Sequence, residues 1–347
     1  MRTIRFQLLA VAALAAAMLS QGCEQKCEQC QSKEERHITL DLTGATVTTK
    51  ALDVPSLSES NVVRCYLYVF DQQGALSKML TSASGSYDFY LTDGIYDFVA
   101  VANFGSEGAA NAGTTSSTIT RRDLMNTFVP LGANEVGSLV MVGSLDKHSI
   151  QADEKLTVEV KRIVSKVTYK IRSQFKGSLA ELKFVIDDIY MTNVVGGMDL
   201  AVTLTTPNAG DSWFNEMDSD PVQQAMAGYP KDLLSGQIGT EMKMPKDSIE
   251  TGHTFYVYPN ASTDNHDKAT WSPRCTRFVV KATLGDKVTY YPVTLAEVGR
   301  NKHYHIDLTI TNYGVNHPED IPDKYEYVES FVRVAEWEDG GIISSTF

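Results

Sequence analysis

The chain has 347 residues and a formal net charge of −12, with 31 basic and 43 acidic side chains. An acidic chain without a cluster of lysine and arginine repels nucleic acid and anionic lipid surfaces, so neither is expected as a partner. The hydrophobic fraction of 43% is sufficient for ordinary cores, and the length is typical of two domains.

The first 22 residues have the composition of a secretory signal peptide. Two arginines precede an apolar run that ends at Leu19, and Gly22-Cys23 follow shortly afterwards. The run is too short to span a bilayer as a helix, which needs about 20 residues. A cysteine after a small residue is similar to the bacterial lipoprotein signal, so we expect a lipid (palmitate) on Cys23 and export through the periplasm to the outer membrane. Plain secretion without a lipid is the alternative. Residues 23–36 are expected to form a polar tether.

The first predicted strand begins at His37. Ile38, Leu40 and Leu42 alternate with polar residues, which indicates a half-buried strand. A polar, threonine-rich stretch ends at Lys50, and a loop that contains Pro55 follows. The strand is therefore short and separated from the rest of the chain.

Alternation and turn residues predict the other elements of the first half. A short helix, Arg121–Phe128, is expected because Thr120 can cap its N-terminus. The sequence Asp93-Gly94 predicts a hairpin between the two strands that flank it. The strands are expected at Val62–Phe70, Tyr87–Leu91, Ile95–Ala102 and Leu139–Gly143.

The boundary between two domains is expected near Ser165. The apolar pattern of Leu156–Ile171 slips by one residue near Ile163, which implies a bulge or a break between two strands. The predicted N-terminal domain therefore spans residues 37–165, and the C-terminal domain spans residues 166–347.

The second half repeats the character of the first. In the strand Lys302–Thr311, Tyr304 and the residues at intervals of two are expected to point inward, and His303, His305, Asp307 and Thr309 outward. A linker, Asn312–Asp323, precedes the last strand. The other predicted elements are strands at Leu182–Met191, Thr254–Tyr258, Thr276–Leu284, Val288–Leu295 and Tyr325–Trp337, and a helix at Pro221–Ala227. Many short strands with few short helices predict an all-β chain of two antiparallel β-sandwiches in tandem.

No pattern in the chain indicates catalysis, a metal or a cofactor. Cys27 and Cys30 form half of a zinc motif without a second pair at the right spacing. His303 and His305 lie on one face of a strand without a third ligand nearby. Adjacent strand residues such as Asp187-Asp188 point to opposite faces, so they cannot act on one substrate atom.

The two ends of the chain are the candidate functional elements. A protease that cuts an exposed loop between Lys50 and Ala51 would separate the lipid and the first strand, residues 37–50, from the body. If that strand then left, the sheet would expose unpaired backbone groups and an apolar groove, which is a template for a strand of another chain.

The C-terminal strand is the candidate strand to fill such a groove. It follows the linker and ends the chain, within residues 325–347. Its apolar residues lie on both faces, which is typical of a strand buried between two layers, and head-to-tail contacts of this kind generate open filaments. One face carries Val328, Val332 and Val334, and the other carries Phe331, Ala335 and Trp337.

Five stretches, in this order, resemble the fimbrillin superfamily of Bacteroidales, the subunits of type V fimbriae: Val62–Gly74, Asp93–Asn103, Val158–Val167, Arg300–Asp307 and Val332–Trp337. The resemblance covers nearly the whole mature chain. It implies two transthyretin-like β-sandwich domains, export as a lipoprotein, removal of the first strand by a trypsin-like protease, and polymerisation with other fimbrial subunits by donor-strand exchange. It also implies a cell-surface location and a part in adhesion to a host or bacterial receptor.

The maturation site departs from the family pattern. The family's cleaved position is typically arginine, and the matching basic residue here is Lys50. Arg36 and Arg64 are the second choices. A cut after Arg36 would leave the first strand attached, and a cut after Arg64 would damage a core strand, so Lys50 is preferred.

Two alternatives to a polymerising subunit remain open at this point. The chain is a fimbrial anchor if it keeps its lipid and its first strand, although the long C-terminal strand favours a polymerising subunit. A surface lipoprotein that binds glycans through Trp213 or Trp271 is the alternative from another class, and it predicts a monomer.

Overall fold

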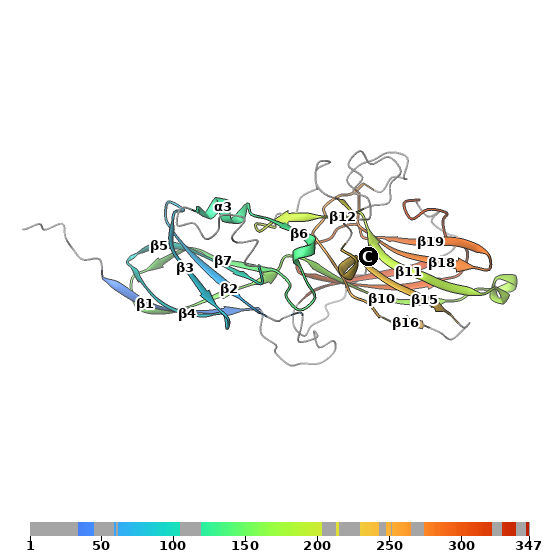
Figure 1. Ribbon diagram of the computed structural model, residues 1–347, viewed down its shortest axis with the longest axis horizontal. Coiled ribbons are helices and arrows are strands. Elements are labelled where there is room, and N and C mark those ends of the chain that lie inside the picture. Colours follow the sequence, from blue (N-terminus) through green and yellow to red (C-terminus); the bar gives the residue numbers. More distant parts are fainter. Residues whose placement is uncertain are drawn as a thin grey trace, which may run out of the picture.

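The computed structural model describes residues 34–44, 59, 62–104, 119–202, 213–214, 230–242, 248–250, 252–264, 274–320, 328–337 and 345–346. The strands form an elongated molecule in which two sets of sheets follow each other along the long axis (Figure 1). Residues 35–162 supply the first two of the larger sheets and residues 165–346 supply the other two. The predicted all-β fold of tandem β-sandwiches is confirmed.

The first sandwich consists of a three-stranded and a five-stranded sheet. The three-stranded sheet has the order β4 (Ser86–Thr92), β1 (Glu35–Thr43), β8 (Glu154–Glu159). The five-stranded sheet has the order β3 (Leu76–Ser82), β2 (Cys65–Asp71), β5 (Gly94–Ala102), β7 (Met141–Ile150), β9 (Lys161–Arg162). All pairs are antiparallel except β1 with β8, which is parallel.

The second sandwich contains the C-terminal strand. Its six-stranded sheet has the order β16 (Ser248–Glu250), β10 (Ser165–Ser173), β20 (Lys302–Ile310), β21 (Val328–Glu336), β22 (Ser345–Thr346), and β17 (Phe255–Val257) also pairs with β10. The facing sheet has the order β15 (Ser235–Glu241), β11 (Phe184–Thr192), β18 (Arg277–Leu284), β19 (Lys287–Thr294). Here the β10–β20 pair is parallel.

Short elements join the two sandwiches. The strand β6 (Phe128–Pro130) of the first half pairs with β13 (Gly197–Asp199) of the second, whereas β12 (Val194–Val195) and β14 (Trp213–Phe214) pair within the second half. Arg300 adds a polar tie, because its guanidinium donates to the carbonyls of Val142 at 2.6 Å and Lys161 at 2.9 Å in the first half. Burial lowers the pKa of Arg300 to about 10.

The helices are short and lie in the connections. The helix α3 (Arg121–Met125) begins with a capping box, in which Thr120 and Asp123 accept each other's backbone N–H. The predicted cap is therefore confirmed, and the helix ends three residues earlier than expected. Among the described residues, the other helices are α4 (Lys231–Leu234) and two 3₁₀ turns, η1 (Leu131–Ala133) and η2 (Gly177–Glu181), and the predicted helix Pro221–Ala227 lies outside the described residues.

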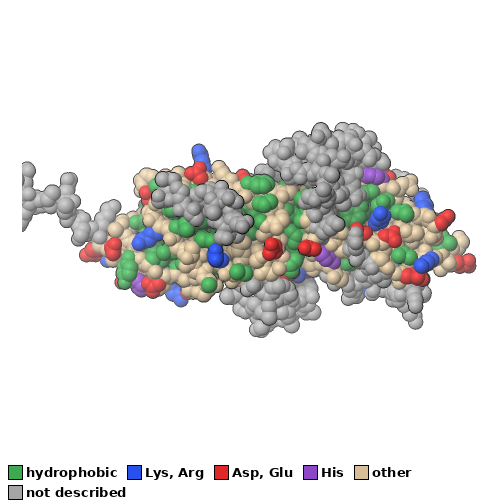
Figure 2. Space-filling model, in the orientation of Figure 1, with side chains coloured by type: hydrophobic (Ala, Val, Ile, Leu, Met, Phe, Trp, Pro, Cys, Tyr) green, Lys and Arg blue, Asp and Glu red, His purple; other side chains and the backbone are tan. Residues whose placement is uncertain are grey.

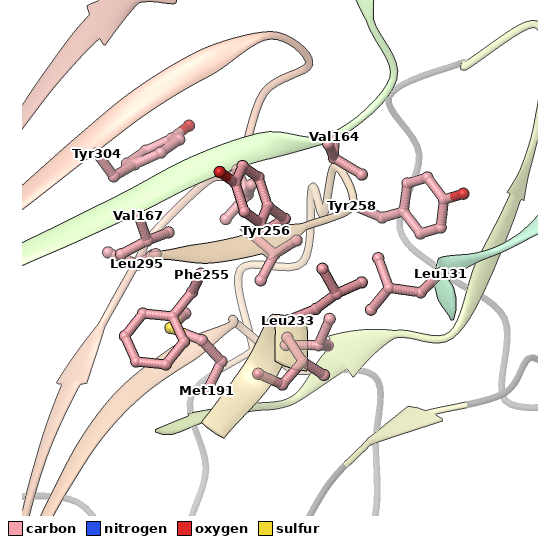
Figure 3. Packing of buried hydrophobic residues seen from close by; sticks show 14 of the residues in the cluster. Leu131, Val164, Val167, Met191, Leu233, Phe255, Tyr256, Tyr258, Leu295 and Tyr304 are labelled. Atoms are coloured by element: carbon pink, nitrogen blue, oxygen red, sulfur yellow. The ribbon is translucent and has the colours of Figure 1, made fainter. Parts of the chain in front are cut away.

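The apolar residues form two clusters. One lies between the sheets of the first sandwich and includes Ile38, Leu40, Leu67 and Val69. The other includes residues of both halves and is therefore continuous across the junction. Figure 3 shows Leu131 of the first half beside Tyr258 of the second, and the Tyr258 hydroxyl donates to the carbonyl of Val129 at 2.9 Å.

Several local predictions differ from the structure, including a turn and the strands β3 and β15, which were not predicted. Asp93-Gly94 does not close a hairpin, because β4 pairs with β1 and β5 pairs with β2, so the turn carries the chain from one sheet to the other. The strand β3 was not predicted; its residues are only partly buried at a sheet edge, where the alternation is weak. The predicted break near Ile163 is confirmed, since β8 ends at Glu159 and β10 begins at Ser165.

Candidate functional site

The first strand, β1, occupies the centre of its sheet. It pairs antiparallel with β4 on one side and parallel with β8 on the other. Leu40 lies opposite Tyr87 in one ladder and opposite Leu156 in the other. A strand in this position has its backbone groups paired on both sides, so its removal would leave two unpaired edges facing each other.

The inward face of β1 forms part of the core. Ile38 and Leu40 are both 0% exposed, and Leu42 is partly buried against the same cluster. The slot beneath them is lined by side chains from both sheets, including Leu67, Val69, Phe89, Phe98, Leu156 and Val158. Without β1, this slot would be an apolar groove that runs the length of a strand.

Polar contacts hold β1 at its rim. Arg36 forms a two-pronged contact with Asp93, with Nε–Oδ1 at 2.7 Å and Nη2–Oδ2 at 3.2 Å. The Lys155 ammonium lies 2.8 Å from Asp41, and His37 Nε2 lies 2.6 Å from Asp88. The hydrogen bond from Arg36 lowers the pKa of Asp93, and the hydrogen bond from Lys155 lowers the pKa of Asp41.

The chain leaves β1 through a tight backbone contact. The Thr43 carbonyl accepts the N–H of Val160 at 2.9 Å. Gly44 then adopts a φ of +85°, and a Cβ at this position would lie 2.5 Å from the Val160 carbonyl oxygen. Only glycine fits such a turn without strain.

The proposed lipid and cleavage positions Cys23, Lys50 and Ala51 lie outside the described residues. The second-choice basic residues differ in their surroundings. Arg36 is paired with Asp93, whereas Arg64 is exposed directly before β2 and donates to the Tyr66 hydroxyl at 3.4 Å.

The C-terminal strand, β21, lies inside the second sandwich of its own chain. It pairs along its whole length with β20, from Val328 opposite Ile310 to Glu336 opposite Lys302. Val332 and Val334 are partly buried against the core, and Trp337 is 4% exposed. The side chains of the predicted donor residues Val328 and Phe331 lie outside the described part of the strand.

The linker before β21 is fixed to the body up to Asp320. Tyr290 and Val315 exchange two backbone hydrogen bonds of 2.9 Å. Glu319 forms an ion pair of 3.4 Å with Arg277, and both side chains are 0% exposed. Asn193 Nδ2 also donates to Glu319 at 2.9 Å. Neither Arg277 nor Glu319 was singled out in the sequence, because no local pattern indicates that a charged residue such as Glu319, in a Pro/Gly-rich segment, will be buried.

The outward face of β20 carries a polar cluster. The Thr168 hydroxyl lies 2.8 Å from His303 Nε2 and 2.9 Å from His305 Nδ1. Asp307 was expected to be exposed, but it is only 8% exposed because Arg172 and Arg333 on the neighbouring strands cover it with ion pairs. Opposite charges on adjacent strands of one face stabilise each other in this way.

The described residues contain no group of three or more histidine, cysteine, aspartate or glutamate side chains placed to hold a metal ion. Asp187 accepts from the Thr283 hydroxyl at 2.8 Å, whereas Asp188 contacts Ser235, so the two carboxylates have separate partners. On the face shown in Figure 2, acidic and basic side chains are interspersed. Across the described residues, no helix is long and apolar enough to cross a membrane.

A central first strand with a buried inward face and a C-terminal strand in a second tandem sandwich define a two-domain β-sandwich protein, and solved structures have a similar overall fold. A fimbrillin (fimA) from Porphyromonas gingivalis has 14% sequence identity and a TM-score of 0.62, with 88% of this chain and 98% of that chain covered. The tip fimbrial protein Mfa3 from Porphyromonas gingivalis, with C-terminal truncation, has 14% identity and a TM-score of 0.55, with 88% and 100% covered. A fimbrial assembly protein from Parabacteroides distasonis has 14% identity and a TM-score of 0.50, with 90% and 98% covered.

The family model of the fimbrillin-A associated anchor proteins Mfa1 and Mfa2 matches residues 28–223. The chain therefore belongs to this family and is a fimbrial protein. None of the curated proteins matches the chain. The predicted resemblance to Bacteroidales fimbrillins is confirmed.

Proposed function

We propose that the protein is a structural subunit of a cell-surface fimbria that contributes to adhesion and is joined to its neighbours by exchange of strands. In this proposal residues 37–165 form the accepting domain and residues 166–347 the donating domain. Cys23 carries the lipid during export through the periplasm, and a trypsin-like protease cuts between Lys50 and Ala51. The departing strand is β1, and the C-terminal strand of a second subunit takes its place.

The observation that carries the proposal is the position of β1 between β4 and β8, with Ile38 and Leu40 completely buried. One cut in the chain after β1 would allow this strand to leave. Because β1 is paired on both sides and covers an apolar slot, its departure leaves a groove of the kind that another extended strand fills by β-augmentation. Burial of the apolar side chains of an incoming strand, at about 25 cal/mol per Å², stabilises each junction by several kcal/mol as an order of magnitude.

The family name favours a second candidate, the anchor. An anchor keeps its lipid and β1, so its groove stays closed while its C-terminal strand enters the groove of another subunit. Lys50 instead of arginine at the expected cleavage position is consistent with a chain that an arginine-specific protease leaves intact.

Limited trypsin treatment of the mature chain separates these possibilities, with N-terminal sequencing and size-exclusion chromatography of the product. A polymerising subunit gives a new terminus at Ala51 and SDS-resistant ladders, and deletion of residues 325–347 abolishes the ladders. An anchor retains β1 and stays monomeric whether or not trypsin, which also cleaves after lysine, cuts at Lys50, but its C-terminal strand binds a second fimbrial subunit from which the first strand has been removed. A chain that is cut at Ala51, loses residues 35–43 and binds no C-terminal strand in the vacated groove contradicts strand exchange.

A further inference from the structure

A buried polar cluster, here called the junction cluster, lies where the two sandwiches meet. It consists of Glu59, Arg162, Lys166, Tyr256 and Trp337, and Glu59 is 3% exposed. The Glu59 carboxylate accepts from the Tyr256 hydroxyl at 2.5 Å and lies 3.0 Å from the Lys166 ammonium. The Glu59 carbonyl accepts from Arg162 Nε at 3.2 Å. Burial, and after it the charge of Glu59, raises the pKa of Tyr256.

The cluster encloses the residue that follows β21. The Arg162 guanidinium carbon lies 4.3 Å above the centre of the Trp337 ring, and the Tyr256 ring stacks on Trp337 at 5.9 Å between centroids. Arg162 Nη1 also donates to the Trp337 carbonyl at 3.5 Å, and the Trp337 N–H donates to the Asn301 carbonyl at 2.9 Å. A cation over an indole face that is shielded from water is attracted strongly to the ring.

The parts of the cluster come from segments that are far apart in the sequence. Glu59 belongs to the connection between β1 and β2, whereas Trp337 ends the C-terminal strand. Arg162 and Lys166 lie on β9 and β10, at the point where the chain passes from the first sandwich to the second. Glu59, which follows the first strand in the sequence, is therefore in the same buried cluster as Trp337 at the end of the last strand.

The opposite end of the C-terminal segment is fixed independently. The Arg277–Glu319 ion pair and the Tyr290–Val315 bridge hold the preceding linker up to Asp320. The segment that has to leave the body, if β21 is to be donated, therefore begins after Asp320. The junction cluster retains the far part of this segment, together with the β20–β21 ladder, the pairing with β22, the Arg333–Asp307 ion pair and the inward-facing valines.

We propose that the junction cluster is a latch through which Glu59, which lies between β1 and β2 in the sequence, controls the release of the C-terminal strand. The inference rests on the proposed function and adds its regulation: the Glu59 carboxylate neutralises Lys166, and the Glu59 backbone carbonyl helps to hold Arg162 against Trp337. Removal of the Glu59 charge takes the paired anion from Lys166, whose side chain is 13% exposed, and the charged acceptor from the Tyr256 hydroxyl, which destabilises the closed cluster unless it opens to water. Opening of the cluster frees Trp337 and with it the end of β21.

Peptide-resolved hydrogen exchange of the mature full-length monomer tests the latch. The variant Glu59→Gln keeps the shape of the side chain and removes its charge, and Glu135→Gln is the matched control because Glu135 is exposed. The expected result is exchange in residues 328–337 that is ~10- to 100-fold faster in Glu59→Gln, with β18 unchanged as an internal reference. Equal exchange of β21 in Glu59→Gln and wild type, or equal acceleration of β18 and β21, would overturn the latch.

A second measurement tests control by the connection. The wild type and Glu59→Gln are cut between Lys50 and Ala51 under conditions that retain β1, and exchange of β21 is measured again. The latch predicts that the cut accelerates β21 in the wild type but adds little in Glu59→Gln, because coupled sites give non-additive effects. Effects of the cut and the substitution that simply add, or a cut without effect on β21, refute the coupling. Both hydrogen-exchange measurements use the monomer, so they are independent of the ladder assay. The latch can be refuted while strand exchange is observed, and the latch can be observed while strand exchange is refuted.

Discussion

The substitution Leu40→Ala tests whether β1 is held by the slot beneath it. Leu40 is 0% exposed and lies between Tyr87 and Leu156 in the two ladders. Buried leucine-to-alanine changes destabilise proteins by about 2–5 kcal/mol, because transfer free energy is lost and a cavity remains. For a slot closed on both sides we expect about 3 kcal/mol. The matched control is Thr39→Ala, on the opposite face of the same strand, with an expected cost below about 1 kcal/mol.

The assay is urea unfolding of the uncut chain, in which a lower midpoint at constant slope reports a loss of stability. The same free energy appears in the cut protein as weaker retention of β1. A loss of about 3 kcal/mol corresponds to on the order of a hundredfold higher dissociation constant for the strand, which native mass spectrometry of the cut complex can follow. If Leu40→Ala costs no more than Thr39→Ala in both assays, the inward face of β1 does not hold the strand and the reasoning is refuted.

Three further predictions concern the frame around the site. Glu319→Ala removes the carboxylate that is paired with the fully buried Arg277 and should lower the free energy of unfolding by about 3–5 kcal/mol in urea titration; a loss below about 1 kcal/mol contradicts a stabilising buried pair. In Gly143→Ala the new Cβ would lie 2.0 Å from a carbonyl oxygen of β8, so the melting temperature should fall. Gly132→Ala is the control, because a Cβ there has nothing within 4 Å and should leave the melting temperature nearly unchanged. Equal melting temperatures of the two variants contradict the close approach of Gly143 to β8. The hydrogen bond and the ion pair with Arg36 lower the pKa of Asp93. Their contribution to the stability of the folded protein is therefore complete above the unfolded pKa near 3.8 and is lost as the pH falls through the folded pKa. Retention of β1 in the cut protein should weaken in acid, and less so in Asp93→Asn; identical pH profiles of the two proteins contradict the assignment.

The sequence indicated the strands themselves better than their partners. The alternation of Ile38, Leu40 and Leu42 predicted a half-buried strand, which is confirmed for Ile38 and Leu40. The parallel pairing of β1 with β8 joins Leu40 to Leu156, and no local pattern specifies a contact across so many residues. The prediction of a hairpin at Asp93 was wrong for the same reason, because turn residues predict a change of direction but not which sheet the next strand enters.

Buried charged residues are a second feature of the structure that the sequence did not predict. Glu59 and Glu319 are buried although their sequence surroundings are polar or turn-like, and Arg162 is a buried charge within an apolar stretch. A charged side chain is buried only when a partner neutralises it, and here the partners come from distant segments. Asp307 follows the same rule, since the alternation correctly placed it on the outward face but could not show that two arginines would cover it.

The direction of β1 constrains any strand that replaces it. Because β1 runs antiparallel to β4 and parallel to β8, a strand that enters with the direction of β1 restores both ladders. A strand of opposite direction would have to change the pairing type on both sides, and its side chains would meet the slot in a different register. Under the proposed exchange, Val332 and Val334 have the same spacing of two as Ile38 and Leu40, so the C-terminal strand can fill both fully buried positions in a single register. The groove therefore imposes one polarity on the incoming strand, and successive subunits that follow it are joined head to tail, which is the geometry of an open filament.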